Sequence, residues 1–320
     1  MAGAVVNPML GQCLDSASPP ITLFDGFKHT VKMHGKANAL ASKPNHTAEF
    51  SFVSWEGYYE NCLSFAKALL KLDFKPHSSV NILGFNSPEW FYSLLGCVAA
   101  GGIAAGIYTT NLADACAYIT EHSDCEVVCL DDDSQLQKIV DTIDKSPTLK
   151  MIVQWLPTKT GRKSGDKIGH ATYMTYADFI AAGADIPLAS VEERIAAQKP
   201  GQCASLIYTS GTTGPPKAVM ISHDNAVWTS HAAENVMGGG SVDDRLISYV
   251  QARQKRMCAL ARDKSVCKRS ERLRRFSSDP PSERVHETSS RRPSPCSLPC
   301  TYYRPKCPPS LPPLFTRVLL

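Results

Sequence analysis

Between residues 51 and 250, the apolar positions of the chain alternate between helical spacing and short continuous runs. Ser54 can cap a helix in which apolar residues recur every three or four positions, at Tyr59, Leu63, Ala66 and Leu70. The run "VNILGF", residues 80–85, follows this helix and predicts a buried strand. The same order of helix and strand returns further along the chain.

A second helix is predicted to begin after Ser87, which can cap it, with Pro88 at the first helical position and Glu89 in the first turn. Gly101 and Gly102 predict where it ends. Further strands are expected at 103–108, 125–130, 149–155, 203–209, 218–222 and 245–250. Further helices are expected at 112–122, 134–143, 175–183 and 225–237.

The expected strands are apolar along most of their length and lack a period-2 alternation. Strands of this kind are buried on both faces, as in a parallel sheet that is covered by helices. We therefore predict an α/β fold with a parallel sheet. The longest apolar run, Leu94 to Tyr108, is broken by glycines and is shorter than the roughly 18–20 residues of a membrane span, so it predicts a helix followed by a strand.

Composition divides the chain into three segments, 1–50, 51–250 and 251–320. The first is weakly patterned and has one apolar patch, at residues 21–24. The last holds 10 of the 22 prolines, and 16 Lys and Arg against 5 Asp and Glu, which is a net charge of +11. Because the whole chain carries +4, residues 1–250 carry −7. We expect residues 251–320 to form a disordered basic tail.

Twelve cysteines raise the question of disulfide bonds. Six of them lie in apolar segments, where cysteine behaves as a small apolar residue, and we expect these six to be reduced: Cys62, Cys97, Cys116, Cys125, Cys129 and Cys203. The start of the sequence has no basic n-region and no clear apolar h-region, so a secretory signal is not expected. These features predict a cytoplasmic protein.

The stretch "YTSGTTGPPKAVMISHDN", residues 208–225, places hydroxyls, two glycines and a lysine between two expected strands. A phosphate chain needs many hydrogen-bond donors, close approach of the backbone, and positive charge. The residues that supply them are Thr209, Ser210, Gly211, Thr212, Thr213, Gly214 and Lys217. A proline before Lys217 and an alanine after it exclude the Walker A pattern of P-loop kinases and GTPases. An ordinary turn rich in Ser, Thr and Gly is the alternative interpretation.

The order T-S-G-T-T-G-x-P-K resembles the AMP-binding motif of the adenylate-forming enzymes, the superfamily of acyl-CoA synthetases, luciferases and peptide-synthetase adenylation domains. Upstream, "VSWEGYYENCLSFAKALLKLDF" and "NILGFNSPEWFYSLLGCVAAGGIAAGIYTTN" resemble long-chain acyl-CoA synthetases of the bubblegum type. The resemblance covers about residues 20–250. It implies an incomplete N-terminal subdomain of the adenylate-forming fold.

This resemblance implies a long-chain fatty acid–CoA ligase. In that family a fatty carboxylate attacks the α-phosphate of Mg-ATP to give acyl-adenylate and pyrophosphate, and the thiol of coenzyme A then forms a thioester with the acyl group. The implied ligands are ATP, Mg²⁺, coenzyme A and a fatty acid. Residues 209–214 and Lys217 would neutralise the β- and γ-phosphates as pyrophosphate leaves.

His223 follows the motif, as histidine does in related enzymes, and it is a candidate for the acyl site. A histidine satisfied by backbone at a strand end is an equal alternative. Ala218 stands where the family usually has glycine and Pro215 occupies a variable position, and we expect both to be tolerated. The acids at 131–133 are interpreted as a solvated strand end, and no metal-binding residue is predicted.

The resemblance ends near residue 250. The PLSH-like, Y-G-x-T-E and T-G-D motifs of the family and its C-terminal catalytic lysine have no counterpart in residues 251–320. An altered reading frame or a misassigned exon would produce such a change, and an evolved tail is the alternative. No catalytic residue is therefore assigned: the chain is interpreted as a truncated ligase, or else as a noncatalytic nucleotide-binding fragment or an interaction protein with a basic tail. No nucleic-acid-binding module accompanies the basic clusters, and peripheral contact with a membrane remains open.

Overall fold

The structure is a computed structural model that describes residues 20–43, 47–209 and 215–236. Apart from residues 47 and 48, the described residues belong to one unit, which is built around a large sheet. The strand expected at 245–250 and the tail expected at 251–320 lie outside the described residues. The boundaries 1–50, 51–250 and 251–320 therefore stay predictions.

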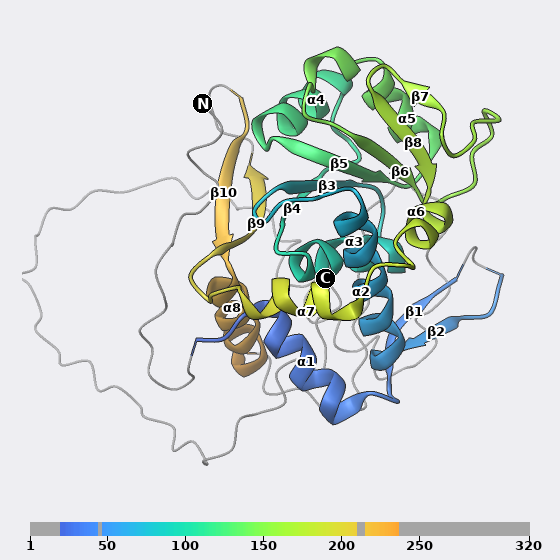
Figure 1. Cartoon of the computed structure of the whole chain (residues 1–320). Coiled ribbons are helices and arrows are strands. Elements are labelled where there is room, and N and C mark those ends of the chain that lie inside the picture. Colours follow the sequence, from blue (N-terminus) through green and yellow to red (C-terminus); the bar gives the residue numbers. More distant parts are fainter. Residues whose placement is uncertain (1–19, 44–46, 210–214, 237–320) are drawn as a thin grey trace, which may run out of the picture. The chain divides into compact units, whose positions relative to one another are not determined.

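An eight-stranded sheet forms the centre of this unit (Figure 1). Its strand order is β10-β9-β4-β3-β5-β6-β8-β7. The strands are β3 Ser79–Leu83, β4 Ile103–Ile107, β5 Cys125–Leu130, β6 Met151–Gln154, β7 Lys167–Ile168, β8 Ala171–Thr175, β9 Cys203–Thr209 and β10 Lys217–Ser222. All neighbours from β9 to β8 are parallel, whereas the edge strands β10 and β7 are antiparallel to β9 and β8. The predicted α/β fold with a parallel sheet is confirmed, with two antiparallel edges that the sequence pattern did not predict.

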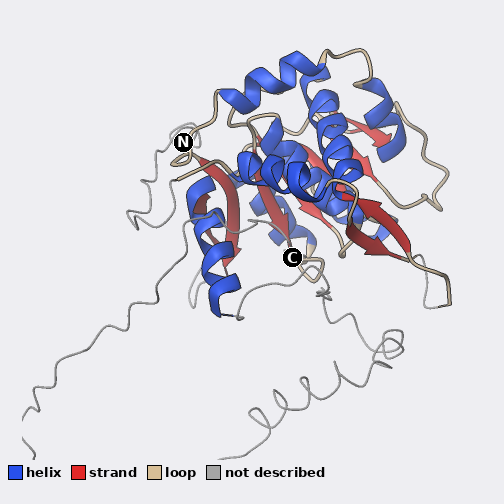
Figure 2. Cartoon of the chain, turned by 90° about the horizontal axis from the view of Figure 1, so that it is seen from below, coloured by secondary structure: helices blue, strands red, loops and turns tan. Residues whose placement is uncertain are grey.

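Helices cover both faces of the sheet (Figure 2). Residues of one group of helices share a core with the first face: α1 Leu23–His34, α2 Trp55–Lys71, α3 Pro88–Ala99, α6 Tyr176–Ala182, α7 Leu188–Ala196 and α8 His223–Val236. Residues of the other group share a core with the second face: α4 Ala113–His122, α5 Asp133–Val140 and the short 3₁₀ helix η2 Ile143–Lys145. In Figure 1 the labels α4 and α5 lie on the opposite side of the sheet from α2 and α3.

The central strands are apolar throughout because successive residues enter different cores. In β3, Val80 and Ile82 belong to the first core, and Leu83 belongs to the second. In β5, Val127 belongs to the first core and its neighbour Val128 to the second. Side chains alternate between the two faces of a strand, so a strand that is covered on both sides needs apolar residues at consecutive positions.

The predicted helix caps are present. The Ser54 hydroxyl accepts a hydrogen bond from the backbone N–H of Gly57 at 3.1 Å, and the Ser87 hydroxyl accepts one from Trp90 at 3.2 Å. After α3 the chain turns at Gly101, whose φ of +80° is a conformation that favours glycine. The apolar run from Leu94 to Tyr108 is thus the end of a helix followed by strand β4, as predicted.

Several elements were not predicted from the apolar pattern, among them strands β7 and β8 of the large sheet. The weakly patterned first segment contains α1, and it also contains β1 Asn38–Ser42, which pairs antiparallel with β2 Ser51–Ser54. Helix α7 occupies a stretch for which no element was expected.

The buried thiols agree with the prediction from composition. All six cysteines expected to be reduced core residues are buried and free. Among the described residues, no helix is long and apolar enough to cross a membrane.

Replacing Ser54 with alanine is expected to destabilise the protein by about 1 kcal/mol, because the N–H of Gly57 loses its cap. Urea unfolding followed by circular dichroism would measure the change. Ser64→Ala is the matched control, since Ser64 lies within the same helix and bonds only the Glu60 carbonyl. That control is expected to change stability by less than about 0.5 kcal/mol, and equal losses in the two variants would contradict the capping role of Ser54.

Candidate functional site

The order of strands in the sheet reverses at its centre, which places a topological switch point at the carboxyl edge. From the central strand β3 the chain passes to β4 on one side through α3, and then to β5 on the other side through α4. These two helices cover opposite faces of the sheet. In open α/β sheets, ligands bind outside the carboxyl ends of the strands at such a switch point. Strand β9 pairs parallel with β4, so Thr209 at the end of β9 lies at the same edge of the sheet as Tyr108, which follows β4.

The motif that was expected to hold phosphate connects the two strands of a β-hairpin. Strands β9 and β10 pair antiparallel, and their register places Lys217 directly opposite Thr209. Both side chains are exposed. Directly opposed residues lie on one face of a hairpin, with Cβ atoms roughly 4.5–5.5 Å apart. Lys217, at the end of the motif, therefore lies beside Thr209, its first hydroxyl residue.

The structure brings together two of the residues that the sequence assigned to this site, Thr209 and Lys217. The others, Ser210, Gly211, Thr212, Thr213 and Gly214, lie outside the described residues. Their predicted contacts with phosphate stay predictions. The ends of the loop already define a donor set, a hydroxyl and an ammonium group that face solvent side by side, and this set is suited to a phosphate oxygen.

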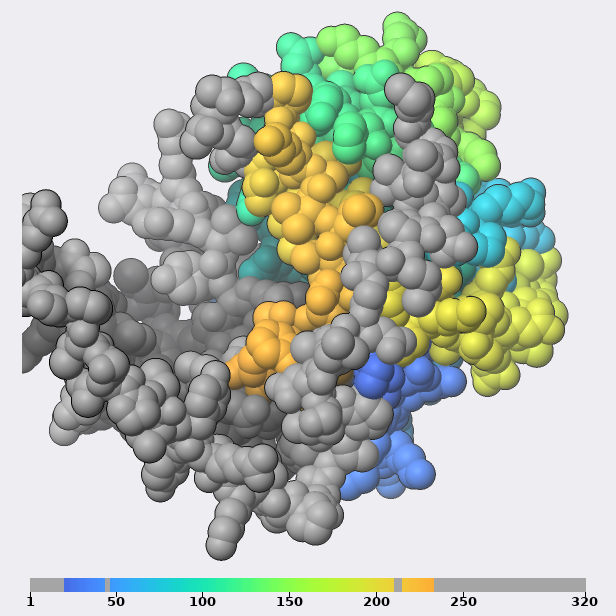
Figure 3. Space-filling view, turned by 90° about the vertical axis from the view of Figure 1, so that its left-hand side faces the viewer, coloured from blue at the N-terminus to red at the C-terminus, as the bar shows by residue number. Residues whose placement is uncertain are grey.

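The hairpin has two different faces. On the face of Thr209 and Lys217, Ile207 and Val219 oppose each other and are 48% and 44% exposed. On the other face, Tyr208 is buried against the second core. Figure 3 shows residues of β10 and α8, in orange, at the surface on this side of the molecule. The apolar pair Ile207 and Val219 is an accessible surface next to the donor set.

Tyr208, the first residue of the motif, is tied to the rest of the sheet. Its hydroxyl lies 3.0 Å from Nδ1 of His122 at the end of α4, and the two rings meet edge to face. Burial raises the pKa of Tyr208, so the phenol stays protonated at neutral pH. This contact ties strand β9, which leads into the motif, to the end of α4.

His223 is buried, with only 3% of its surface exposed, at the first position of α8. Its Nδ1 accepts a hydrogen bond of 3.4 Å from the backbone N–H of Leu23, the first residue of α1. The first N–H groups of a helix have no partner within the helix, so this contact satisfies one of them. The backbone contact is what the alternative interpretation of His223 expects, and a role for His223 at the acyl site stays a prediction.

The chain is expected to lose about 3 kcal/mol of stability as the pH falls from 6.5 to 4, because His223 must become charged in a buried place. Burial lowers the pKa of His223 from 6.5 to about 4, and Asp25 opposes this shift only in part. Between these two pH values the unfolded chain binds a proton at this histidine and the folded chain does not. The free energy of unfolding is therefore highest above pH 6.5 and falls by about 1.4 kcal/mol for each pH unit below it. Urea unfolding at several pH values would measure the slope.

His223→Asn keeps a hydrogen-bond acceptor but cannot titrate, and it is expected to flatten this pH dependence. The control is His29→Asn in helix α1, since the His29 side chain is only partly buried. An unchanged slope in His223→Asn would show that other groups cause the acid sensitivity.

The three acids at 131–133 have separate structural partners. Asp131 is buried, where burial raises its pKa, and it accepts the N–H of Phe85 at 2.9 Å. Asp132 caps α5, and Asp133 accepts the N–H of Lys159 at 2.7 Å. The expected solvated strand end is wrong for Asp131, since its carboxylate joins the end of β5 to the turn after β3. In the described ranges, no group of three His, Cys, Asp or Glu side chains is placed to hold a metal ion.

Comparisons with known proteins agree on one enzyme family. The family model of the AMP-binding enzymes matches residues 27–252. The long-chain-fatty-acid–CoA ligase ACSBG2 of Xenopus laevis is 43% identical over 215 residues, which are 67% of this chain and 28% of the relative. The human ACSBG2 and ACSBG1 ligases are each 38% identical and match 72% and 68% of this chain, and 33% and 29% of their own lengths. The chain thus spans about a third or less of the length of these relatives.

Solved structures share the fold. The apo structure of MbtA from Mycobacterium smegmatis superposes with a TM-score of 0.58 at 16% identity and covers 71% of this chain and 38% of its own. The anthranilate–CoA ligase AuaEII, in complex with anthranoyl-AMP, gives a TM-score of 0.54 at 22% identity over 68% of this chain and 38% of its own. Each neighbour is larger than the matched part, and at these identities the likeness concerns the fold alone.

Proposed function

The chain belongs to the family of AMP-binding enzymes, and on this premise we propose that its hairpin β9–β10 holds the phosphates of ATP. The expected resemblance to bubblegum-type long-chain acyl-CoA synthetases is confirmed by the ACSBG ligases, which are 38–43% identical over the matched part. The activity proposed for the protein to which this part belongs is that of a long-chain fatty acid–CoA ligase. A fatty carboxylate is activated with ATP to acyl-AMP, and the acyl group is then transferred to coenzyme A.

One observation carries the proposal, namely that the register of the hairpin places Lys217 opposite Thr209 at the carboxyl edge of the sheet. A cation alone at this edge would be an ordinary exposed lysine. Lys217 is instead paired with the Thr209 hydroxyl, and a loop with two glycines joins the two residues. Together they can bind phosphate oxygens.

The chemical difficulty of the first step is negative charge, because a carboxylate has to approach a triphosphate. The ammonium group of Lys217 offsets this charge, and the hydroxyl of Thr209 donates a hydrogen bond to an oxygen of the leaving pyrophosphate. Ser210, Thr212 and Thr213 would add hydroxyl donors, and Gly211 and Gly214 would let backbone N–H groups approach. A magnesium ion that accompanies ATP would bind the phosphates themselves, and we assign it no ligand among the described residues.

A second candidate function is favoured by the sequence of residues 251–320, in which the PLSH-like, Y-G-x-T-E and T-G-D motifs of the family have no counterpart. On this proposal the 320-residue chain binds nucleotide without completing the reaction, or acts through its basic residues 251–320 as an interaction protein. The first proposal includes coenzyme A and a fatty acid as substrates, a cytoplasmic location and peripheral contact with membranes. Neither proposal includes specific binding of nucleic acid.

Carboxylate-dependent exchange between ATP and pyrophosphate tests the two proposals on the purified 320-residue chain. Exchange that requires palmitate would support adenylation by this chain. A full-length ACSBG2 ligase, assayed in parallel, shows that the conditions are suitable. If the relative exchanges pyrophosphate and this chain does not, adenylation by the chain alone is ruled out, and binding of MgATP measured by calorimetry would then support the nucleotide-binding fragment.

The sequence after Val250 has its own test. We propose that the tail results from a changed reading frame or exon, and translation of the other two frames downstream of the Val250 codon should then recover PLSH-like and Y-G-x-T-E motifs. Detection of peptides from 251–320 in expressed protein, with no such motifs in the other frames, would contradict this origin.

A further inference from the structure

The segment that follows the first turn of α1 concentrates positive charge in an otherwise acidic part of the chain. Residues 26–43 hold four lysines and no acid, whereas residues 1–250 as a whole carry a net charge of −7. The four are Lys28, Lys32, Lys36 and Lys43. The first three are exposed, and Lys28 and Lys32 lie four positions apart, on one face of the helix. The exposed side of α1 is therefore a basic surface.

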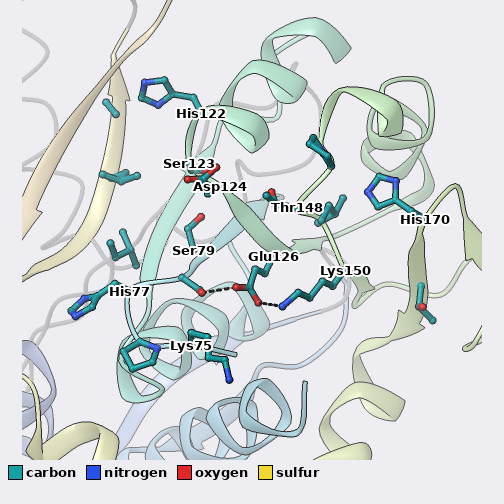
Figure 4. Close-up of a pocket in the computed structure, with 18 of the residues that line it drawn as sticks. Lys75, His77, Ser79, His122, Ser123, Asp124, Glu126, Thr148, Lys150 and His170 are labelled. Atoms are coloured by element: carbon teal, nitrogen blue, oxygen red, sulfur yellow. Dashed lines mark hydrogen bonds and ion pairs between the residues drawn. The ribbon is translucent and has the colours of Figure 1, made fainter. Parts of the chain in front are cut away.

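Three of these lysines take no part in holding the fold together. The ion pairs found within the described ranges involve other lysines, namely Lys71, Lys75, Lys145 and Lys150. Lys150, for example, donates to Glu126 at 2.8 Å, as Figure 4 shows. The helix dipole favours lysines near the end of a helix, which is a structural reason for Lys32 and Lys36. That reason does not extend to Lys28, which lies in the second turn of α1.

A hairpin with an exposed aromatic side chain follows α1. Strands β1 and β2 form a two-stranded sheet of their own, and Figure 1 shows them extending outward beside α2. One face of the hairpin packs on the first core through Leu40 and Val53. On the other face Phe52 lies opposite Ala41 and is 56% exposed, although a strand face toward water ordinarily carries polar residues. Burial in the core therefore does not explain the aromatic side chain at this position.

Phe52 belongs to a cluster in which aromatic rings and a cation lie together. The ring centroids of Phe50 and Phe52 are 6.2 Å apart, and Nζ of Lys43 lies 4.9 Å from the centroid of the Phe50 ring. An ammonium group in this position is attracted to the face of the ring. Met33, which is 57% exposed in the last turn of α1, adds an apolar side chain next to Lys32 in the chain. Apolar and cationic groups are thus interspersed on α1 and on the hairpin.

We propose that the lysines of α1 and the aromatic pair of the hairpin β1–β2 form a docking surface for a membrane that contains anionic lipids. Exposed phenylalanine side chains enter the boundary between head groups and acyl chains, and lysines are attracted to the anionic head groups. The proposal rests on the proposed function for its purpose, because a ligase of long-chain fatty acids takes a substrate that partitions into membranes.

The composition of this surface favours a lipid over a nucleic acid. Proteins hold nucleic acids with arginines as well as lysines, and they stack bases on aromatic rings. Residues 20–54 contain no arginine, and Met33 offers no ring on which a base could stack. Its apolar side chain and those of Phe50 and Phe52 suit the acyl region of a bilayer.

Co-sedimentation of the full 320-residue chain with vesicles is the first measurement. The chain is expected to bind vesicles of phosphatidylcholine with phosphatidylserine, and to bind vesicles of phosphatidylcholine alone more weakly. A failure to bind the anionic vesicles would overturn the proposal. Residues 251–320, with their net charge of +11, would also attract such vesicles, so a second measurement has to locate the contact.

Phe52→Trp locates the contact, because lipids brominated on their acyl chains quench only tryptophans that reach them. The fluorescence that this substitution adds is expected to be quenched on anionic vesicles. Val219→Trp is the reference, since Val219 is 44% exposed on β10, which Figure 1 places on the other side of the molecule from β1 and β2. Equal quenching in the two variants would show that the chain is held at another surface. Quenching of Phe52→Trp by a single-stranded oligonucleotide and not by the lipids would assign the surface to nucleic acid; either result overturns the proposal.

The double variant Lys28→Gln, Lys32→Gln is expected to bind anionic vesicles about 10- to 30-fold more weakly, since each lysine near an anionic surface adds to the attraction. Lys159→Gln with Lys163→Gln removes the same charge from the exposed loop after β6. Equal affinities of the two double variants would overturn the role of the α1 lysines.

Binding of MgATP separates this proposal from the proposed function. Both double variants are expected to bind MgATP as tightly as the unchanged chain, because the substituted lysines lie outside the hairpin β9–β10. A chain that binds MgATP but shows no selective quenching of Phe52→Trp would overturn the docking surface alone. Selective quenching in a chain that binds no MgATP would support the docking surface and overturn the ATP site.

Discussion

Replacing Lys217 with alanine is expected to weaken binding of MgATP to the chain about 10- to 100-fold, since a hydrogen bond to a charged group is worth about 1.5–3 kcal/mol. The register of the hairpin is the reason, because it holds the ammonium group opposite Thr209, where both can contact one phosphate group. The side chain is exposed, so its removal should leave the stability of the fold unchanged. Calorimetric titration with MgATP would measure the loss.

Lys199→Ala provides the matched control for this variant. Lys199 is also exposed but lies before β9, at the other end of the strand from Thr209. Both variants remove one positive charge, so a general electrostatic attraction of nucleotide would weaken binding equally in the two. Equal affinities in Lys217→Ala and Lys199→Ala would therefore contradict a phosphate contact of Lys217.

Gly183→Ala is expected to destabilise the fold by about 3 kcal/mol, a large value for the addition of one methyl group. The added Cβ atom would overlap the backbone nitrogen of Ala68 and lie 2.6 Å from its Cα atom. A backbone cannot rotate aside as a side chain can, so the end of α6 has to separate from α2. Urea unfolding would measure the change in the free energy of unfolding.

The control for Gly183→Ala is the same substitution at Gly106. There the nearest atom to an added Cβ belongs to the Trp90 ring at 3.6 Å, an ordinary contact. Gly106→Ala is expected to be neutral or to stabilise strand β4 slightly, because glycine is unfavourable inside a strand. A loss in Gly183→Ala no greater than in Gly106→Ala would mean that α6 moves away from α2 without cost.

The central fold was predictable because its strands are buried on two sides. Consecutive apolar residues such as those of β5 are typical of a strand covered by helices, and the caps at Ser54 and Ser87 marked where helices begin. Helix α1 was not predicted because it has only a few buried positions, among them Phe24 and Phe27, in an otherwise polar stretch. The direction of β10 could have been predicted, since residues 210–216 between β9 and β10 are too few for the crossover that a parallel neighbour needs.

The candidate site was predictable in its residue types and not in its geometry. The order of hydroxyls, glycines and lysine indicated phosphate, but the pairing of Thr209 with Lys217 depends on the register of two strands. The contact of His223 with Leu23 joins positions 200 residues apart, and no local pattern contains it. A cavity at the amino edge of the sheet is lined by residues from β3, β4, β5 and the hairpin β9–β10, which are likewise distant in sequence.

The pairing of Ala104 with Ser205 and the bond between Leu23 and His223 have a consequence for biosynthesis. Strands β3, β4, β5, β6 and β8 find their partners within short stretches of chain, so they can assemble as they leave the ribosome. The loops closed by β9 and by His223 are long, and closing them costs more entropy. Phe27 of α1 can pack on Trp55 and Tyr58 of α2 early, whereas the bond from Leu23 to His223 forms only when one of the last described segments has been made, and Lys217 arrives at a sheet that has already formed.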